Sequence, residues 1–232
     1  MRAYQHPTTK NFGDTLPLPI LRHLGHQVER ADRDETGKVV TVGSVMNVTR
    51  PGDWVWGTGV QHDRRYSAAR TKFLAVRGPI TRASIDNVHI PQVYGDPALL
   101  LPHLYDPDVD VRHDVGVIPH YLDAIQSRRR HPDYLHISVK MPWQHIIRQI
   151  KSCKHIIATS LHGIIAADAY GIPVTWNGSY SRKVVSTNLK FQDYFLATRG
   201  SCQRPGRIPP LPRDEWTRLC DGLTHAARHL PR

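Results

Sequence analysis

The stretch that decides the fold runs from His155 to Trp176 and reads HIIATSLHGIIAADAYGIPVTW. It begins with a short apolar run, His155–Ala158, that is typical of a buried strand. An apolar stretch of helical length follows at Leu161–Tyr170, and a second short run follows at Pro173–Trp176. A strand, a helix and a strand in this order favour parallel strands. The pattern therefore predicts an α/β protein.

The same alternation extends along most of the chain. Further strands are expected at Val28–Ala31, Val39–Val42, Trp54–Trp56, Phe73–Val76, Val115–Ile118 and Leu135–Ile137. Further helices are expected at Thr15–Leu24, Pro79–Ile85, Tyr121–Arg129, Trp143–Ser152 and Asp214–His229. The stretch Pro102–Asp110 is rich in Pro and Asp, which disfavour both helix and strand, so we expect a linker at 103–110. The sequence thus predicts two Rossmann-like domains, 1–102 and 111–197, and a Pro/Gly-rich segment with a terminal helix in 198–232.

Composition narrows the classes of partner. Lys and Arg number 31 against 20 Asp and Glu, a net charge of +11 that favours nucleic acid, phosphorylated small molecules or an anionic membrane surface. Hydrophobic residues make up 40% of the chain, which excludes a disordered or collagen-like protein. No apolar run approaches the roughly 20 residues that span a bilayer, and no signal-peptide pattern is present, so we expect a cytoplasmic location. The cysteines Cys153, Cys202 and Cys220 form no CxxC pair and fit reduced thiols.

Two glycine-containing segments are candidates for close contact with a ligand. Asn11-Phe12-Gly13-Asp14 precedes the first predicted helix; Gly13 permits a close approach and Asp14 suits an N-cap, although a plain capped turn explains the same letters. Gly57-Thr58-Gly59 follows a predicted strand, where glycine amides can approach a phosphate. His62 stands at the third glycine position of the dinucleotide fingerprint and no P-loop occurs, so a tight turn is the alternative.

Arg77 follows the strand Phe73–Val76, and Pro79 suits the first position of the next helix. Sheets of α/β proteins bind ligands at the carboxyl ends of their strands. An arginine at that place is a candidate for bidentate binding of a carboxylate or phosphate. A surface salt bridge is the alternative for Arg77.

His162 is the candidate for acid–base chemistry. Ser160 is expected to cap the helix that follows, which places His162 in the first helical turn, beside amides that favour an anion. The helix dipole disfavours imidazolium there, so a neutral ring is available as a base or a hydrogen-bond donor. A structural histidine is the alternative. No HExxH or Cys/His spacing predicts a metal site, and Arg64-Arg65-Tyr66 matches no nucleic-acid motif.

Taken in order, nine segments resemble the polysaccharide pyruvyl transferase family, in particular its short exopolysaccharide-type members. The segments are NFGD at 11–14, VGS at 42–44, VWGTG at 55–59, VRGP at 76–79, YGDPALL at 94–100, GVIPHY at 116–121, SLHG at 160–163, AYGIP at 169–173 and KFQDY at 190–194. The segment beyond Arg199 carries no part of the resemblance.

The resemblance implies a fold similar to that of GT-B glycosyltransferases, with the site in the cleft between the two Rossmann-like domains. It implies phosphoenolpyruvate as donor, a glycan sugar that is often lipid-linked as acceptor, a pyruvate ketal as product, and no metal or organic cofactor. One departure stands out: many members have Arg where this chain has Ser160. The candidates for the replacing cation are Arg77, Arg182, Lys183 and Lys190.

Ketal formation requires a proton donor, a base and groups that bind anions. We expect His162 to be the general acid or base, with His120 as a second candidate. Arg77, Lys190 and the amides of Gly57–Gly59 are expected to bind the donor. Asp14 and Asp96 are expected to orient acceptor hydroxyls or to cap turns. The full set of expected substrate-binding residues is Asn11, Gly13, Asp14, Gly57, Thr58, Gly59, Arg77, Asp96, His120, Ser160, Leu161, Gly163, Arg182, Lys183 and Lys190.

Three other interpretations stay open at this point. A glycosyltransferase that uses a nucleotide sugar fits the same architecture. A basic RNA- or DNA-binding protein is supported by net charge alone, and we expect no nucleic-acid partner. An inactive relative is suggested by the short chain and the missing Arg. The net charge also predicts peripheral contact with an anionic inner membrane leaflet.

Overall fold

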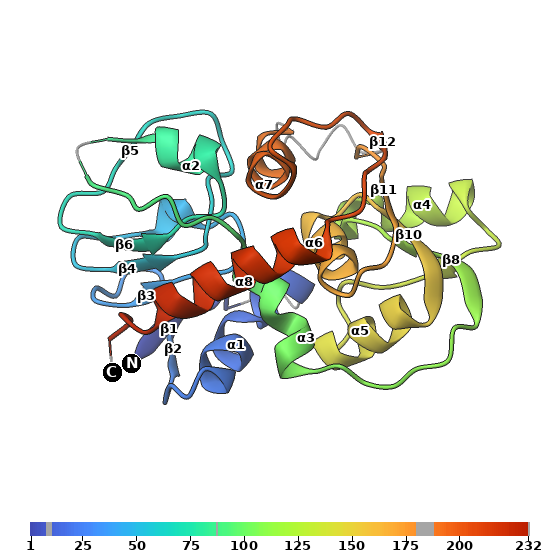
Figure 1. Cartoon of the computed structure of the whole chain (residues 1–232), viewed down its shortest axis with the longest axis horizontal. Coiled ribbons are helices and arrows are strands. Elements are labelled where there is room, and N and C mark those ends of the chain that lie inside the picture. Colours follow the sequence, from blue (N-terminus) through green and yellow to red (C-terminus); the bar gives the residue numbers. More distant parts are fainter. Residues whose placement is uncertain (8–10, 87, 180–187, 232) are drawn as a thin grey trace.

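Two five-stranded sheets, one from each half of the chain, organise the structure (Figure 1). The computed structural model describes residues 1–7, 11–86, 88–179 and 188–231. The first sheet has the order β2-β1-β3-β4-β6 and the second has the order β12-β11-β10-β8-β9. Every pair of neighbours is parallel except β11 and β12. The α/β class expected from the sequence is therefore confirmed.

The first half of the chain holds short strands joined by short helices. Its main strands are β1 (Arg2–Tyr4), β2 (Glu29–Ala31), β3 (Val39–Val40), β4 (Trp54–Trp56) and β6 (Lys72–Ala75). A separate two-stranded sheet pairs β5 (Tyr66–Ser67) with β7 (Ile85–Asp86). The helices are α1 (Pro17–His23), α2 (Pro79–Ala83) and α3 (Leu101–Leu104), with the 3-10 helices η1 (Phe12–Thr15), η2 (Met46–Val48) and η3 (Pro97–Leu100).

The second half has longer elements. Its strands are β8 (His113–Ile118), β9 (Leu135–His136), β10 (Cys153–Ala158), β11 (Val174–Trp176) and β12 (Gly206–Arg207). Its helices are η4 (Tyr121–Asp123), α4 (Ala124–Arg130), α5 (Trp143–Lys151), α6 (Leu161–Ala169), α7 (Leu189–Arg199) and α8 (Arg213–Ala227). The strand–helix–strand unit expected over residues 155–176 is present as β10, α6 and β11, with β10 and β11 parallel.

Both sheets share one strand order, in which the first strand of each half lies between the second and the third. In the first half β1 lies between β2 and β3, and in the second half β8 lies between β9 and β10. The direction of winding reverses at this point, and α/β sheets form their ligand crevices there, at the carboxyl ends of the strands. The loops after β1, β3, β8 and β10 are therefore where a site is expected.

One hydrophobic core joins the two halves. It includes Ala3 of β1 and Ile118 of β8 in a single cluster of buried residues. Helix α6 is buried on nearly every side because it packs on β10 and β11 of its own sheet and on η3 of the first half. Continuous packing of this kind holds the two sets of loops in a defined relation.

The last helix returns to the first half. Figure 1 shows α8 crossing the molecule to end near β1. Trp56 Nε1 donates to the carbonyl of Leu223 at 3.0 Å, and Trp216 Nε1 donates to the carbonyl of Leu99 at 3.1 Å. Helix α7 likewise packs against α2. No helix in the described ranges is long and apolar enough to cross a membrane.

Three details of the expected pattern are wrong. The predicted linker begins inside α3, because Pro102 is tolerated in a first helical turn and Leu101 is buried. The expected helix Tyr121–Arg129 is divided into η4 and α4. Helix α2 ends before Ile85, because Ile85 pairs with Tyr66 in a strand. Residues 105–112 carry neither helix nor strand, as a linker would.

Candidate active site

His162 lies in the first turn of α6, as predicted, with 12% of its side chain exposed. Its ring fills the space above Gly13: a Cβ atom on Gly13 would lie 2.1 Å from His162 Nδ1, closer than any side chain allows. Phe12 meets the same ring edge-on at 6.5 Å between centroids. The close approach inferred for Gly13 is therefore made by a histidine from the other half of the chain.

Asp96 is the acidic neighbour of His162. Its Oδ2 lies 3.6 Å from His162 Nε2, and that nitrogen is buried without a hydrogen-bond partner among the described residues. Burial would raise the pKa of the Asp96 carboxyl, but His162 and the amide of Ala98 outweigh it and hold that pKa below its usual range. Asp96 thus stays ionised beside the histidine.

Asp96 also organises the backbone around it. It is the N-cap of η3, where Oδ1 accepts from the Ala98 amide at 3.0 Å, and Oδ2 accepts from the Gly43 amide at 3.2 Å. The turn-capping interpretation is therefore confirmed, while a role toward an acceptor hydroxyl stays a prediction. Because the loops after β3 and β10 both reach this carboxylate, it connects the switch points of the two sheets.

A second group of charges lies beside this pair. Burial lowers the pKa of Lys190, at the start of α7, to about 8; the charge of Arg77 lowers it further and Asp123 opposes the change. Burial also lowers the pKa of His120, and Lys190 adds to that effect, while Asp123 and Asp14 raise it. The structure therefore brings Lys190 within electrostatic reach of Arg77 and His120, and His120 within electrostatic reach of Asp14.

Arg77 forms a fully buried ion pair with Asp193, with 3.0 Å between Nε and Oδ2. Its Nη1 donates to Ser44 Oγ at 2.5 Å and its Nη2 to the Val60 carbonyl at 2.8 Å. A surface salt bridge is therefore wrong for Arg77. Asp193 compensates the charge of Arg77, and the expected role of Arg77 in binding the donor stays a prediction.

The Gly57-Thr58-Gly59 loop does not present its glycine amides to a ligand. The Gly57 amide donates to the Ala75 carbonyl at 2.8 Å and the Gly59 amide to the Gly43 carbonyl at 2.9 Å. Thr58 Oγ1 also donates to the Gly43 carbonyl, at 2.9 Å. Gly59 instead makes room for Arg77, whose Cζ would lie 2.3 Å from a Cβ there. The tight-turn interpretation therefore describes this loop, which packs against the guanidinium of Arg77.

Anion binding by the first turn of α6 stays a prediction. Ser160 stands at the N-cap with extended dihedral angles (φ −100°, ψ 131°), but its side chain makes no capping hydrogen bond. The first amides of a helix have no partner within the helix, and here the Ser160 side chain does not supply one. Leu161 and Gly163 serve packing, since Leu161 is buried and a Cβ on Gly163 would lie 2.9 Å from Ile118 Cγ2.

Four predicted residues remain: Asn11, Asp14, Arg182 and Lys183. Asn11 is the N-cap of η1, and its side chain makes no capping hydrogen bond. Asp14 lies within η1 and Leu16 is the N-cap of α1, so the capping role expected for Asp14 is wrong. Arg182 and Lys183 lie outside the described residues. Among those that are described, no cluster of three or more His, Cys, Asp or Glu side chains is arranged to hold a metal ion.

Sequence reasoning missed a buried carboxylate at the second switch point. Asp123 accepts hydrogen bonds from Thr159 Oγ1 at 2.9 Å and from Ser179 Oγ at 2.9 Å. Thr159 Oγ1 in turn accepts from the His120 amide at 2.8 Å. This network fixes the loops after β8 and β10 against each other. The residues around Asp123 form no motif, and an aspartate at the start of a helix is common, so the sequence does not predict its role.

Fold and site define an α/β protein with a histidine–carboxylate pair at the facing switch points of two mainly parallel sheets. The model of the polysaccharide pyruvyl transferase family matches residues 36–176, more than half of the chain, so the protein belongs to that family. The uncharacterized protein L143 of Acanthamoeba polyphaga mimivirus is 31% identical over 191 residues. That alignment covers 77% of this chain and 62% of L143, so the chain spans less than two thirds of this relative. No solved structure matches the chain.

Proposed function

We propose that the protein is a polysaccharide pyruvyl transferase that moves pyruvate from phosphoenolpyruvate to a glycan sugar as a ketal and releases phosphate. The observation that carries the proposal is the His162–Asp96 pair at the junction of the two sheets, together with membership of the family. Lys190 and the uncapped amides of α6 supply the positive potential that a carboxylate and a phosphate need.

The chemistry fits a group that both takes and gives a proton. A first sugar hydroxyl adds to the central carbon of phosphoenolpyruvate while its methylene carbon gains a proton and becomes a methyl group. A second hydroxyl of the sugar then bonds to the same carbon, and phosphate leaves with the electron pair of the broken C–O bond. His162 relays these protons, and the Asp96 carboxylate beside its Nε2 stabilises the imidazolium that forms. His120 is the second candidate for a proton-transfer group.

The domain assignment belongs to the same proposal. Two Rossmann-like domains, 1–102 and 111–197, are arranged as in GT-B glycosyltransferases, with the site between them. The shared strand order of the two sheets and the contact of Gly13 with His162 across the halves support this arrangement. The segment 198–232 adds α8 to the first domain, where Trp56 and Trp216 fix it.

A donor panel tests the proposal. We expect phosphoenolpyruvate to raise the melting temperature of the protein by several degrees near 100 times its Kd, where ligand binding adds about 2.7 kcal/mol. Nucleotide sugars are expected to raise it less than phosphoenolpyruvate does, and a short oligonucleotide is expected to leave it unchanged. A shift with a nucleotide sugar alone would make the protein a glycosyltransferase, and salt-steep binding of the oligonucleotide alone would make it a nucleic-acid-binding protein.

Donor binding is expected to weaken as the pH rises through about 8. Lys190 has its pKa lowered to about 8, so its ammonium is present below that pH and lost above it. The Kd of phosphoenolpyruvate, measured from pH 7 to pH 9.5, should therefore increase across this range. Lys190→Arg keeps its charge throughout and should flatten the curve. An unchanged pH profile in that variant would remove Lys190 from the donor site.

Gly13→Ala is expected to lower turnover by at least 100-fold, because the added Cβ would overlap the His162 ring and displace it. Gly222→Ala in α8 is the matched control, since a Cβ there meets Val93 at 3.6 Å, an ordinary contact. Steady-state kinetics and the melting temperature of both variants check this expectation. Equal turnover in the two variants would contradict the placement of His162.

The acceptor is a glycan, which we propose to be lipid-linked, and the protein to be cytoplasmic with peripheral contact at the inner membrane face. Leu122 and Ile125 are exposed on η4 and α4, beside three successive arginines, Arg128–Arg130. Exposed apolar and basic residues on one short segment suit an anionic bilayer surface. Co-sedimentation with anionic vesicles should be strong at low salt and lost at high salt.

A further inference from the structure

A cavity of about 160 Å³ lies next to the site, at the carboxyl ends of β8 and β9. Its walls come from η4 and α4 on one side and from the segment after β9 on the other. The lining side chains that matter are Tyr121, Arg128, His136, Ser138 and Lys140. We call it the α4 pocket. None of the residues assigned above to proton transfer lines it.

The walls of the α4 pocket are cationic. Arg128 and Lys140 both line it, and the described lining residues include no Asp or Glu. Arginine binds phosphate oxygens with two hydrogen bonds in a fixed plane, and lysine adds a mobile positive charge. A phosphate group is therefore the anion that this pair suits.

The other walls suit a sugar ring. Tyr121 is 43% exposed, and Lys140 Nζ lies 5.9 Å from the centroid of its aromatic ring. His136 Nε2 lies 2.8 Å from the His131 carbonyl, so this nitrogen carries the hydrogen and Nδ1 is an acceptor in the neutral ring. That Nδ1 is buried and has no partner among the described residues. A sugar hydroxyl is a hydrogen-bond donor of the kind that this nitrogen lacks.

Two contacts join the α4 pocket to the candidate active site. The ring centroids of His120 and Tyr121 lie 4.4 Å apart. Tyr121 lines the pocket, and His120 is within electrostatic reach of Lys190. The carbonyl of Val139, another lining residue, accepts from the Phe12 amide at 2.7 Å, and Phe12 contacts the His162 ring. A ligand in the pocket therefore lies beside the reacting groups rather than at a remote surface.

We infer that the α4 pocket binds a glycosyl phosphate, the phosphate between Arg128 and Lys140 and the sugar against Tyr121 and His136. This inference rests on the proposed function, in which such a ligand is the phosphate-bearing end of the acceptor. The α4 pocket is then the subsite for the acceptor sugar that lies next to the phosphate. The phosphate itself has two sources, a lipid diphosphate or a nucleotide diphosphate, which share this chemistry.

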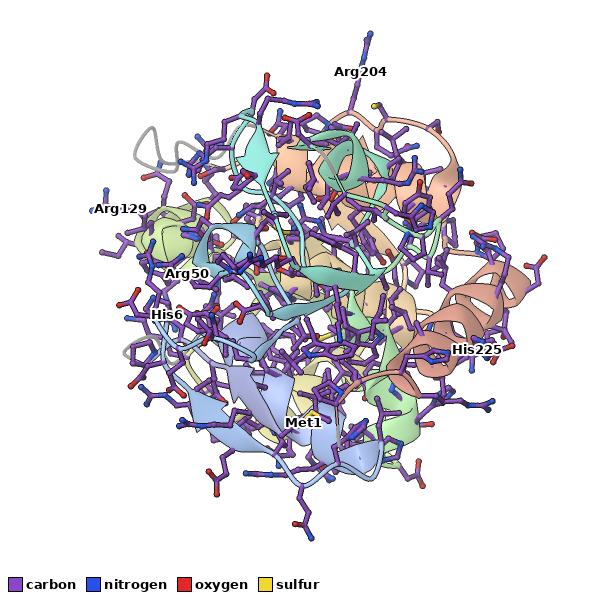
Figure 2. The ribbon with its side chains drawn as sticks, turned by 90° about the vertical axis from the view of Figure 1, so that its left-hand side faces the viewer. Met1, His6, Arg50, Arg129, Arg204 and His225 are labelled. Carbon is purple, nitrogen blue, oxygen red and sulfur yellow. The ribbon has the colours of Figure 1, made fainter. Side chains whose placement is uncertain are left out.

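The test compares two neighbouring arginines. Arg128 lines the pocket, whereas Arg129 does not and extends into solvent (Figure 2). Calorimetric titration with glucose, galactose and mannose 1-phosphates should show binding that Arg128→Gln weakens by about 10-fold or more, the effect of losing a charge-assisted hydrogen bond. Lys140→Gln should act in the same direction. Arg129→Gln removes the same charge one residue away and should leave the Kd unchanged.

Further ligands identify the source of the phosphate. Phosphoenolpyruvate binding, measured in the same variants, tests the proposed function separately from the pocket. UDP-glucose and glucose linked through diphosphate to a short prenyl chain distinguish a nucleotide from a lipid as the source of the phosphate, by which of them binds tighter. The Kd of phosphoenolpyruvate should be unchanged in Arg128→Gln. Equal loss in Arg128→Gln and Arg129→Gln, or a weaker phosphoenolpyruvate Kd in Arg128→Gln, overturns the inference. Failure of phosphoenolpyruvate to bind, with Arg128-dependent binding of sugar phosphates intact, would instead overturn the proposed donor and leave the pocket assignment standing.

Discussion

His162→Ala is expected to reduce the turnover of phosphoenolpyruvate by about 10²- to 10⁴-fold, the range that a general acid or base contributes. The ring is 12% exposed, faces the ionised Asp96 at 3.6 Å and has an Nε2 without a partner among the described residues. The measurement is kcat with saturating donor and acceptor, followed by phosphate release.

His225→Ala is the matched control for that variant. His225 is exposed on α8, where its ring meets His229, and Figure 2 shows it on the surface. It should keep the turnover of the wild type. Asp96→Asn should lower kcat as well, because it removes the charge that stabilises imidazolium. Near wild-type turnover in His162→Ala would remove the histidine from the chemistry and return it to a structural role.

Local sequence patterns predicted most elements of the fold. They failed where tertiary contact decides the structure. Helix α7 was not among the expected helices because it packs toward both halves, so buried positions such as Phe191, Asp193 and Tyr194 follow no single face. Strand β1 was not expected because three residues at the start of the chain carry too little pattern.

In the candidate site, too, the sequence predicted local positions but not long-range partners. The place of His162 in the first turn of α6 and of Pro79 at the start of α2 follows from adjacent residues, and both are confirmed. The partners do not follow, because Arg77 and Asp193 are 116 positions apart and Asp96 meets His162 from the other half of the chain. Spacing along a sequence carries no information on such pairs. The sequence therefore did not predict that Arg77 is buried in an ion pair with Asp193.

Asp193→Asn is expected to lower the free energy of unfolding by about 3–5 kcal/mol, because it leaves the Arg77 guanidinium buried without its counter-charge. Urea denaturation measures the change. Arg77→Met with Asp193→Leu should recover part of it, since a buried pair replaced by apolar side chains is often neutral. Recovery is incomplete because Thr81 loses hydrogen bonds to Asp193 from its amide at 2.9 Å and from its hydroxyl at 2.6 Å.

Glu215→Gln is the control for charge removal, because Glu215 pairs with Arg218 on the surface and such pairs contribute about 0–1 kcal/mol. A similar loss in Glu215→Gln and Asp193→Asn would contradict the buried pair as a determinant of stability. The Arg77–Asp193 pair also joins α7 to the first half of the chain, and α7 carries Lys190. Donor binding should therefore weaken in Asp193→Asn under conditions where the variant is still folded, while kcat at saturating donor changes less. An unchanged Kd for phosphoenolpyruvate would separate the buried pair from the donor site and confine Arg77 to holding the two halves together.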